Sequence, residues 1–136
     1  MLQKFSPLII PTLIFSFWAF TFLESALSKL FDLPGNLAYF KGQFSKSFLK
    51  SITPLAFYGI LCLELVSGIS ALTCLILLFT NLELFVKIGI LSLAFISLNV
   101  FLLYAGQRIA KDYAGASGIV GYVIVCLFGL MAIFGR

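Results

Sequence analysis

The sequence predicts an all-α, polytopic membrane protein in which four transmembrane helices form an up-down bundle. Of the 136 residues, 62% are hydrophobic and only 10% are charged, whereas charged residues make up about 25% of a typical soluble domain. The apolar residues form long runs, which cover residues 7–30, 54–80, 84–106 and 114–134. Each run reaches or approaches the roughly 20 residues that a helix needs to cross the hydrocarbon core of a bilayer.

The first run shares one feature with a signal peptide, because Lys4 precedes it. Its apolar stretch is longer than the roughly 7–15 residues of a signal-peptide core, so we expect residues 7–30 to form a first transmembrane helix. Pro7 and Pro11 fall in the opening turns of this helix, where a missing amide donor costs least.

The connection between the first and second spans is predicted to contain a short helix, residues 37–50, that lies in the plane of the membrane interface. The preceding segment, residues 32–36 (Asp-Leu-Pro-Gly-Asn), breaks the first helix. Aromatic and aliphatic side chains then recur every three or four residues, at Leu37, Phe40, Phe44 and Phe48. The other faces carry Lys41, Ser45, Lys46 and Lys50. This pattern is typical of an interfacial amphipathic helix, and a plain cationic loop is the alternative.

The other two connections predict how the later spans are arranged. Residues 81–83 (Asn-Leu-Glu) form a very short turn, so the second and third spans must be antiparallel neighbours in a helical hairpin. Residues 106–118 link the third span to the fourth. The spans use most of the chain, which leaves one domain, residues 1–136, and no room for a separate soluble domain. These connections favour an up-down-up-down bundle.

Small residues at two places are candidates for a close approach of helices in lipid. Ser67 and Ala71 form one pair, and Gly118 and Gly121 form the other. Helices associate in membranes through such small residues, but the ordinary composition of membrane helices explains each pair equally well.

The orientation in the membrane stays open at the level of the sequence. The side with the first and third connections holds Lys29, Lys41, Lys46, Lys50, Arg108 and Lys111. The opposite side holds Lys4, Lys87 and Arg136. The positive-inside rule would place the first and third connections in the cytoplasm. Several of these lysines belong to the predicted interfacial helix, however, where binding to lipid headgroups is an alternative explanation for their position.

Glu64 is the deepest charged residue of the predicted bundle. It lies ten residues inside the second span, about 15 Å from the membrane face at which that helix starts. A lone carboxylate at this depth is expensive, so Glu64 must be protonated or paired and must face the bundle interior. Asn99, the other deep polar group, lies in the third span and is a candidate partner. A functional role and a hydrogen bond that only fixes the packing explain Glu64 equally well.

A mixed-charge polar cluster is predicted at one mouth of the bundle. Topology places its members on one membrane side: Glu24, Lys29, Asp32, Gln107, Arg108 and Asp112. Residues three or four apart share a helix face, so we expect Lys29 to pair with Asp32. Arg108 is expected to pair with Asp112 if the third span continues that far. The cluster suits an anion, a quinone headgroup or a partner protein, and a hydrated helix rim is the structural alternative.

The reactive residue types point away from metal and thiol chemistry. The chain contains no histidine, so we expect no metal site and no histidine-based acid–base mechanism. Cys62, Cys74 and Cys126 fall inside spans, and none belongs to a Cys-x-x-Cys pair. We interpret them as small hydrophobic residues. No span or loop carries a self-sufficient catalytic motif, so the sequence favours a role other than catalysis.

Two short elements resemble those of the DoxX-like family of small membrane proteins. Ser25-Ala-Leu-Ser-Lys29-Leu30 closes the first span, where that family commonly has a Gly/Ser-x-x-Lys-Leu element. Glu64-Leu-Val-Ser-Gly68 lies in the second span, where the family has Glu-x-x-x-Gly. The number and spacing of the spans extend the resemblance over nearly the whole chain.

The resemblance implies a four-helix membrane bundle similar to that of vitamin K epoxide reductases, with the first connection outside the cytoplasm. Members of the family have been linked to thiosulfate:quinone oxidoreductase and to thiol homeostasis at the membrane. Redox-associated members carry an Asp-Cys-Gly-Cys-type element after the third span. Residues 112–117 of this chain read Asp-Tyr-Ala-Gly-Ala-Ser, without cysteine. A dithiol relay needs thiolates, so a redox role would depend on a partner or a bound quinone.

Three functional hypotheses follow. The leading one is a non-catalytic accessory subunit of a larger assembly in a bacterial cytoplasmic membrane, with no cofactor. The alternative is a quinone-linked redox subunit in which Glu64 and the charged mouth hold the quinone. The third is a small-solute or proton carrier built around Glu64 and Asn99. We expect the lipid bilayer, other membrane subunits or further copies of the chain as partners, and no nucleic acid.

Overall fold

The computed structural model describes the backbone of residues 2–135 and the side chains of residues 6–135, and it contains helices but no strand in that range. The helices are α1 (Leu2–Phe31), α2 (Leu33–Gln43), the 3₁₀ helix η1 (Phe48–Ile52), α3 (Thr53–Thr80), α4 (Leu82–Ile109) and α5 (Tyr113–Phe134). Four segments are long and apolar enough to cross a membrane: Ser6–Phe31, Phe48–Thr80, Leu82–Ile109 and Tyr113–Phe134. The predicted all-α polytopic membrane fold is confirmed. The Lys4 side chain and Arg136, used in the orientation count, lie outside the described side chains.

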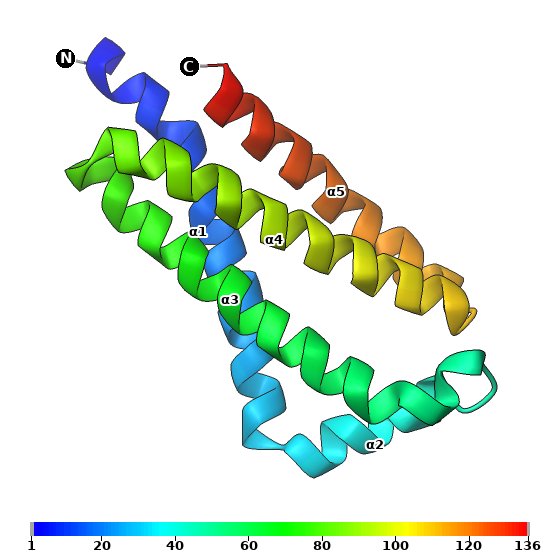
Figure 1. Ribbon diagram of the computed structural model, residues 1–136. Coiled ribbons are helices and arrows are strands. Elements are labelled where there is room, and N and C mark those ends of the chain that lie inside the picture. Colours follow the sequence, from blue (N-terminus) through cyan, green and yellow to red (C-terminus); the bar gives the residue numbers. More distant parts are fainter. Residues whose placement is uncertain (1, 136) are drawn as a thin grey trace.

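The four long helices run alternately up and down, and α1 crosses the others at a steep angle (Figure 1). Contacts are extensive between α1 and α3, between α3 and α4, and between α4 and α5, but sparse between α1 and α5. The core lies where α1 crosses its neighbours, and its largest side chains are Trp18, Phe15, Phe22 and Phe85. α5 is the least covered span, because 22% of its most apolar stretch is buried against 33% in each other span.

Large apolar side chains cover the outer surface of the long helices. Phe20 is 75% exposed on α1, Leu55 is 74% exposed on α3 and Met131 is 68% exposed on α5. A soluble monomer rarely exposes such a continuous apolar surface, whereas lipid tails accept it without cost. The surface therefore contacts the bilayer.

The interfacial helix differs in its bounds from the predicted residues 37–50. The Asp32 side chain accepts a hydrogen bond of 3.0 Å from the Gly35 amide and caps α2, so the helix begins at Leu33, earlier than expected. It ends at Gln43 because hydroxyl groups bond to the local backbone: Ser45 Oγ to the Gly42 carbonyl at 2.8 Å and Ser47 Oγ to the Phe44 carbonyl at 2.9 Å. Such bonds compete with helix continuation.

These altered bounds change the apolar face of that segment. Phe44 is buried at 7% exposure, and Leu37 and Phe40 are half-buried, in agreement with the predicted face. Phe48 belongs to η1 rather than to the same helix, and it is 78% exposed. The lysines Lys41, Lys46 and Lys50 are exposed, as the amphipathic pattern requires.

The second and third connections are shorter than the sequence indicates. Asn81 alone separates α3 from α4, and its side chain caps α4 by accepting a bond of 3.0 Å from the Leu84 amide, which confirms the helical hairpin. α4 continues past residue 106 to Ile109. Lys111 then adopts a left-handed backbone conformation with φ of 61°, and the Asp112 side chain caps α5 by accepting a bond of 3.0 Å from the Gly115 amide.

Small residues bring α1 and α3 together at one point. A Cβ atom added to Gly68 would lie 2.7 Å from Leu23 Cγ and 3.0 Å from the Leu23 backbone nitrogen. Ser67 and Ala71 beside it are fully buried, as expected for a close approach. Gly118 and Gly121 on α5 are exposed and have no other atoms within 4 Å of an added Cβ, so no described helix approaches them.

Candidate functional site

A buried ion pair joins the end of α1 to the middle of α3. Lys29 Nζ lies 3.0 Å from Glu64 Oε2 and donates a hydrogen bond of 3.1 Å to Glu64 Oε1. The Ser25 hydroxyl donates to the same Oε1 at 2.9 Å and accepts a bond of 2.8 Å from Lys29 Nζ. Glu64 is 1% exposed and Lys29 is 9% exposed, so the three side chains form a closed network away from solvent.

The local sequence explains why these side chains meet. Ser25 and Lys29 are four residues apart on α1 and therefore share one face. On α3, Gly68 follows Glu64 by one turn, and the missing side chain at Gly68 lets the α1 backbone approach at Leu23. α1 and α3 are antiparallel, so the close approach at Leu23 and Gly68 sets Ser25 and Lys29 opposite Glu64.

The network can hold two helices together, and its charges cancel. An isolated carboxylate or ammonium inside a bilayer costs at least about 2.5–3.5 kcal/mol, and a hydrogen-bonded pair avoids much of that cost. Glu64 Oε1 accepts two hydrogen bonds and Oε2 faces the ammonium group. Neither oxygen is directed at an open surface, because the residue is 1% exposed.

The predicted pairing of Lys29 with Asp32 is wrong. Asp32 lies beyond the end of α1, where its carboxylate caps α2 and its backbone carbonyl accepts a bond of 2.9 Å from Asn36 Nδ2. Lys29 instead extends into the bundle, toward the only acidic residue that α3 presents. Glu64 needs a counter-charge more than Asp32 does, because Glu64 is buried. The Asp32 carboxylate is exposed and already accepts a hydrogen bond from the Gly35 amide.

Asn99 is not the hydrogen-bond partner of Glu64. The Ser70 and Ser92 hydroxyls lie 2.8 Å apart and fix the register of α3 and α4. Glu64 is six residues before Ser70 and Asn99 is seven residues after Ser92, so the two sit within about 1.5 Å of the same height. The Glu64 carboxylate nevertheless turns to α1, and both amide atoms of fully buried Asn99 lack a hydrogen-bond partner among the described residues.

Arg108 and Asp112 also do not pair in the described part of the chain. α4 stops at Ile109, so Asp112 belongs to the start of α5 and uses its carboxylate on the Gly115 amide. The Arg108 guanidinium lies over the Tyr113 ring, with Cζ 4.7 Å from the ring centroid, in a cation–π contact.

The predicted mouth is therefore divided between separate helices. Glu24 is exposed and, with Ser28, lines a groove on the outer face of α1 and α3. Gln107 lies on α4, where its buried amide oxygen packs against Gly115 and lacks a hydrogen-bond partner. Within residues 6–135, no hydrogen bond or ion pair links the α1 members of the cluster to those of α4 and α5.

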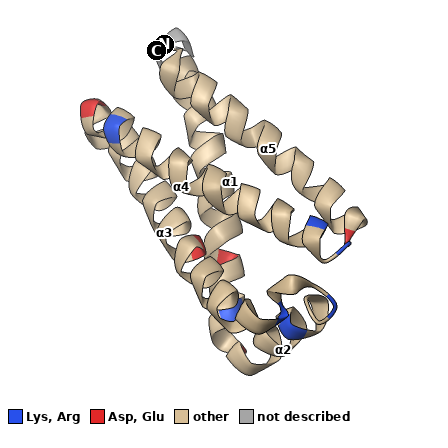
Figure 2. Ribbon diagram, turned by 45° about the vertical axis from the view of Figure 1, so that its right-hand side comes forward, with Lys and Arg blue, Asp and Glu red and all other residues tan. Residues whose placement is uncertain are grey.

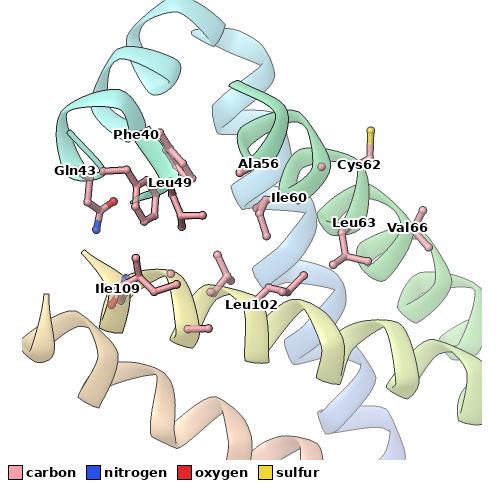
Figure 3. Close-up of a pocket in the computed structure, with 16 residues that line it drawn as sticks. Phe40, Gln43, Leu49, Ala56, Ile60, Cys62, Leu63, Val66, Leu102 and Ile109 are labelled. Carbon is pink, nitrogen blue, oxygen red and sulfur yellow. The ribbon is translucent and has the colours of Figure 1, made fainter. Parts of the chain in front are cut away.

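A cavity that the sequence did not predict lies beneath α2 and η1, between α3 and α4. Its volume is about 630 Å³. In Figure 3, Leu49, Ile60 and Leu102 point into the gap from η1, α3 and α4. Small residues facing one another leave this space: Ala56 and Gly59 on α3, and Ala105 and Gly106 on α4. These small residues are the feature of the sequence from which the cavity could have been predicted.

No family model, curated protein or solved structure matches this chain.

Proposed function

We propose that the protein is a non-catalytic accessory subunit of a larger membrane assembly. The observation that carries this proposal is the closed network of Ser25, Lys29 and Glu64, in which the deepest charged groups satisfy one another. Asp32 and Asp112 are used as helix caps. A scaffold role needs packed helices and a lipid-facing surface, and the described residues provide both.

We further propose a DoxX-like fold in a bacterial cytoplasmic membrane. The residues that carry the resemblance are Lys29 of the first element, and Glu64 and Gly68 of the second. Lys29 and Glu64 form the buried ion pair, and Gly68 provides the close contact with α1. A shared structural purpose for both elements supports the proposal.

The outer face of α5 is the proposed contact surface for the partner. Gly118 and Gly121 are exposed there, with open space above each. Small residues let a second helix approach closely, and van der Waals packing drives helix association in lipid. α5 is also the least covered span, since it lies mainly against α4. The partner is another membrane subunit or a second copy of this chain.

The test is purification of the tagged chain in a mild detergent, with mass spectrometry of the co-eluting proteins. We expect a stoichiometric membrane partner or a homo-oligomer with the unaltered chain, and loss of most of it with Gly118→Leu. Ile69→Phe is the matched control, because Ile69 is 56% exposed on α3 and equally accessible to lipid. A stable monomer without co-eluting protein, or equal effects of both variants, would overturn the proposal.

A further inference from the structure

The cavity beneath α2 and η1 lies at the end of two spans, where hydrocarbon gives way to headgroups. The apolar segment that contains α3 begins at Phe48 and that of α4 ends at Ile109, next to the lining residues Leu49 and Ile109, so we expect the membrane boundary to lie near the cavity. The walls are almost entirely apolar, and the exceptions among the lining side chains are the Cys62 thiol and the amides of Gln43 and Gln107. Gln43 projects from α2 toward Ile109 on α4 across the opening (Figure 3).

Basic residues neighbour the lining residues in sequence on two sides of this opening. Lys41, Lys46 and Lys50 are exposed on α2, η1 and the turn between them, within one to three residues of lining side chains. Arg108 is exposed on α4 between the lining residues Gln107 and Ile109, and Lys111 follows. Figure 2 shows the basic positions of the α2–η1 segment facing those at the end of α4. The nearby acidic residues Asp32 and Asp112 are capping groups.

We propose that the cavity binds one acyl chain of an anionic phospholipid and that the basic rim holds the phosphate headgroup. An apolar pocket of this volume falls within the roughly 300–1,000 Å³ range of small-molecule sites. The location fits an amphiphile, because the chain enters from the hydrocarbon side while the headgroup stays at the interface. The excess of basic side chains over acidic ones favours a negative headgroup over a zwitterionic one.

The chemistry of the walls favours a flexible hydrocarbon chain over a peptide or a polar solute. A peptide segment would bury amide groups that only Gln43 and Gln107 are placed to satisfy. A quinone ring would need directed hydrogen bonds, for which the lining offers only the Gln43 and Gln107 amides. Glu64 neither lines the cavity nor is free, since it is bound by Ser25 and Lys29. This inference does not depend on the proposed accessory role, because the site is formed by a single chain.

Gly59 gives a direct test. It lines the cavity, and an added Cβ there meets nothing within 4 Å, so Gly59→Phe should fill the space without displacing a helix. Gly121→Phe is the control, because Gly121 also has open space but lies on α5, away from the cavity. Both substitutions remove a helical glycine, so the gain in helix propensity is the same.

The measurement is native mass spectrometry of delipidated, detergent-solubilised protein titrated with phosphatidylglycerol or with phosphatidylcholine of the same chains. We expect one phosphatidylglycerol per chain to be retained by the unaltered protein and by Gly121→Phe, and about a tenfold or larger loss of affinity with Gly59→Phe. Combining Lys46→Gln and Lys50→Gln should lower the preference for phosphatidylglycerol by roughly fivefold per lysine while phosphatidylcholine binding stays unchanged.

A second measurement uses the unaltered chain and does not depend on any variant folding. Phosphatidylglycerol with a photoreactive group near the end of one acyl chain should cross-link to residues 56–66 and 102–109. Labelling spread evenly over the lipid-facing helices would overturn the proposal, as would an unchanged affinity in Gly59→Phe. Displacement of phosphatidylglycerol by a short-chain ubiquinone at lower concentration would assign the cavity to a quinone instead and overturn the lipid assignment.

Discussion

Lys29 and Glu64 lie on different helices, 35 positions apart in sequence, yet their charged groups approach to 3.0 Å inside the bundle. Ser25 completes the contact by bonding to both. The pair ties α1 to α3, and these two helices share the most extensive interface of the fold. Removing one charge therefore leaves the other unpaired among buried side chains.

Glu64→Gln should destabilise the protein by about 3–5 kcal/mol, because it leaves the buried Lys29 ammonium without its counter-charge. The loss should appear as a lower midpoint of thermal unfolding in a mild detergent. The double variant Lys29→Met with Glu64→Leu removes both charges and should recover most of the stability. A double variant as unstable as Glu64→Gln would contradict a mainly electrostatic role for the pair.

Gly68→Val should separate α1 from α3, because the added atoms collide with Leu23, including its backbone nitrogen. Overpacking of this kind typically costs about 1–3 kcal/mol. The same substitution at Gly59, also on α3, meets no neighbour and should leave stability nearly unchanged. Unfolding midpoints of the two variants, measured side by side, provide the comparison; equal midpoints would show that the close approach at Gly68 does not matter.

Asp32→Ala should loosen the start of α2 without unfolding the bundle. The substitution removes the capping bond to the Gly35 amide, and a lost cap costs about 1 kcal/mol. Amide hydrogen exchange should accelerate in residues 33–36, while α3 and α4 stay protected. Asp32→Asn retains an acceptor and serves as the control, so faster exchange in both variants would argue against capping as the cause.

Asn99→Leu should keep or raise stability, unlike most substitutions in a packed interior. The fully buried Asn99 amide makes no hydrogen bond with the described residues, and an unsatisfied buried polar group costs about 1–3 kcal/mol. A leucine of similar volume removes that cost. A large loss of stability would show that Asn99 is hydrogen-bonded in the membrane, to water or to a ligand, and would revive its predicted polar role.

The membrane fold was predictable because the length and hydropathy of the runs decide it. The ends of the helices were harder to predict, because they depend on single side chains that bond to the backbone, such as Asp32, Asn81 and Asp112. Each of these residues was visible in the sequence as a polar group near a break. The start of α2 was displaced from residue 37 to Leu33, whereas α4 and α5 begin within two residues of their predicted starts at 84 and 114.

Lys29 and Glu64 were both singled out in the sequence, but in two separate candidate sites, and Ser25 was not among the candidates. Glu64 had to find a partner because of its depth, and Lys29 was expected to bond locally to Asp32. The choice between Lys29 and Asn99 as the partner depends on how α1 crosses α3, which Gly68 and Leu23 determine through contact at the backbone. Periodicity along one helix carries no information about the register of two.

The link between Lys29 and Glu64 also constrains biogenesis. α1 emerges from the ribosome before α3, so Lys29 has no acidic partner during co-translational insertion until Glu64 has been synthesised. Until then the end of α1 is held near the aqueous boundary by its own ammonium group, and it settles to its final depth only with α3. We therefore expect the first two long segments, α1 and α3, to insert in a concerted way, and a nascent chain truncated before residue 64 to present an uncompensated cation to the translocon.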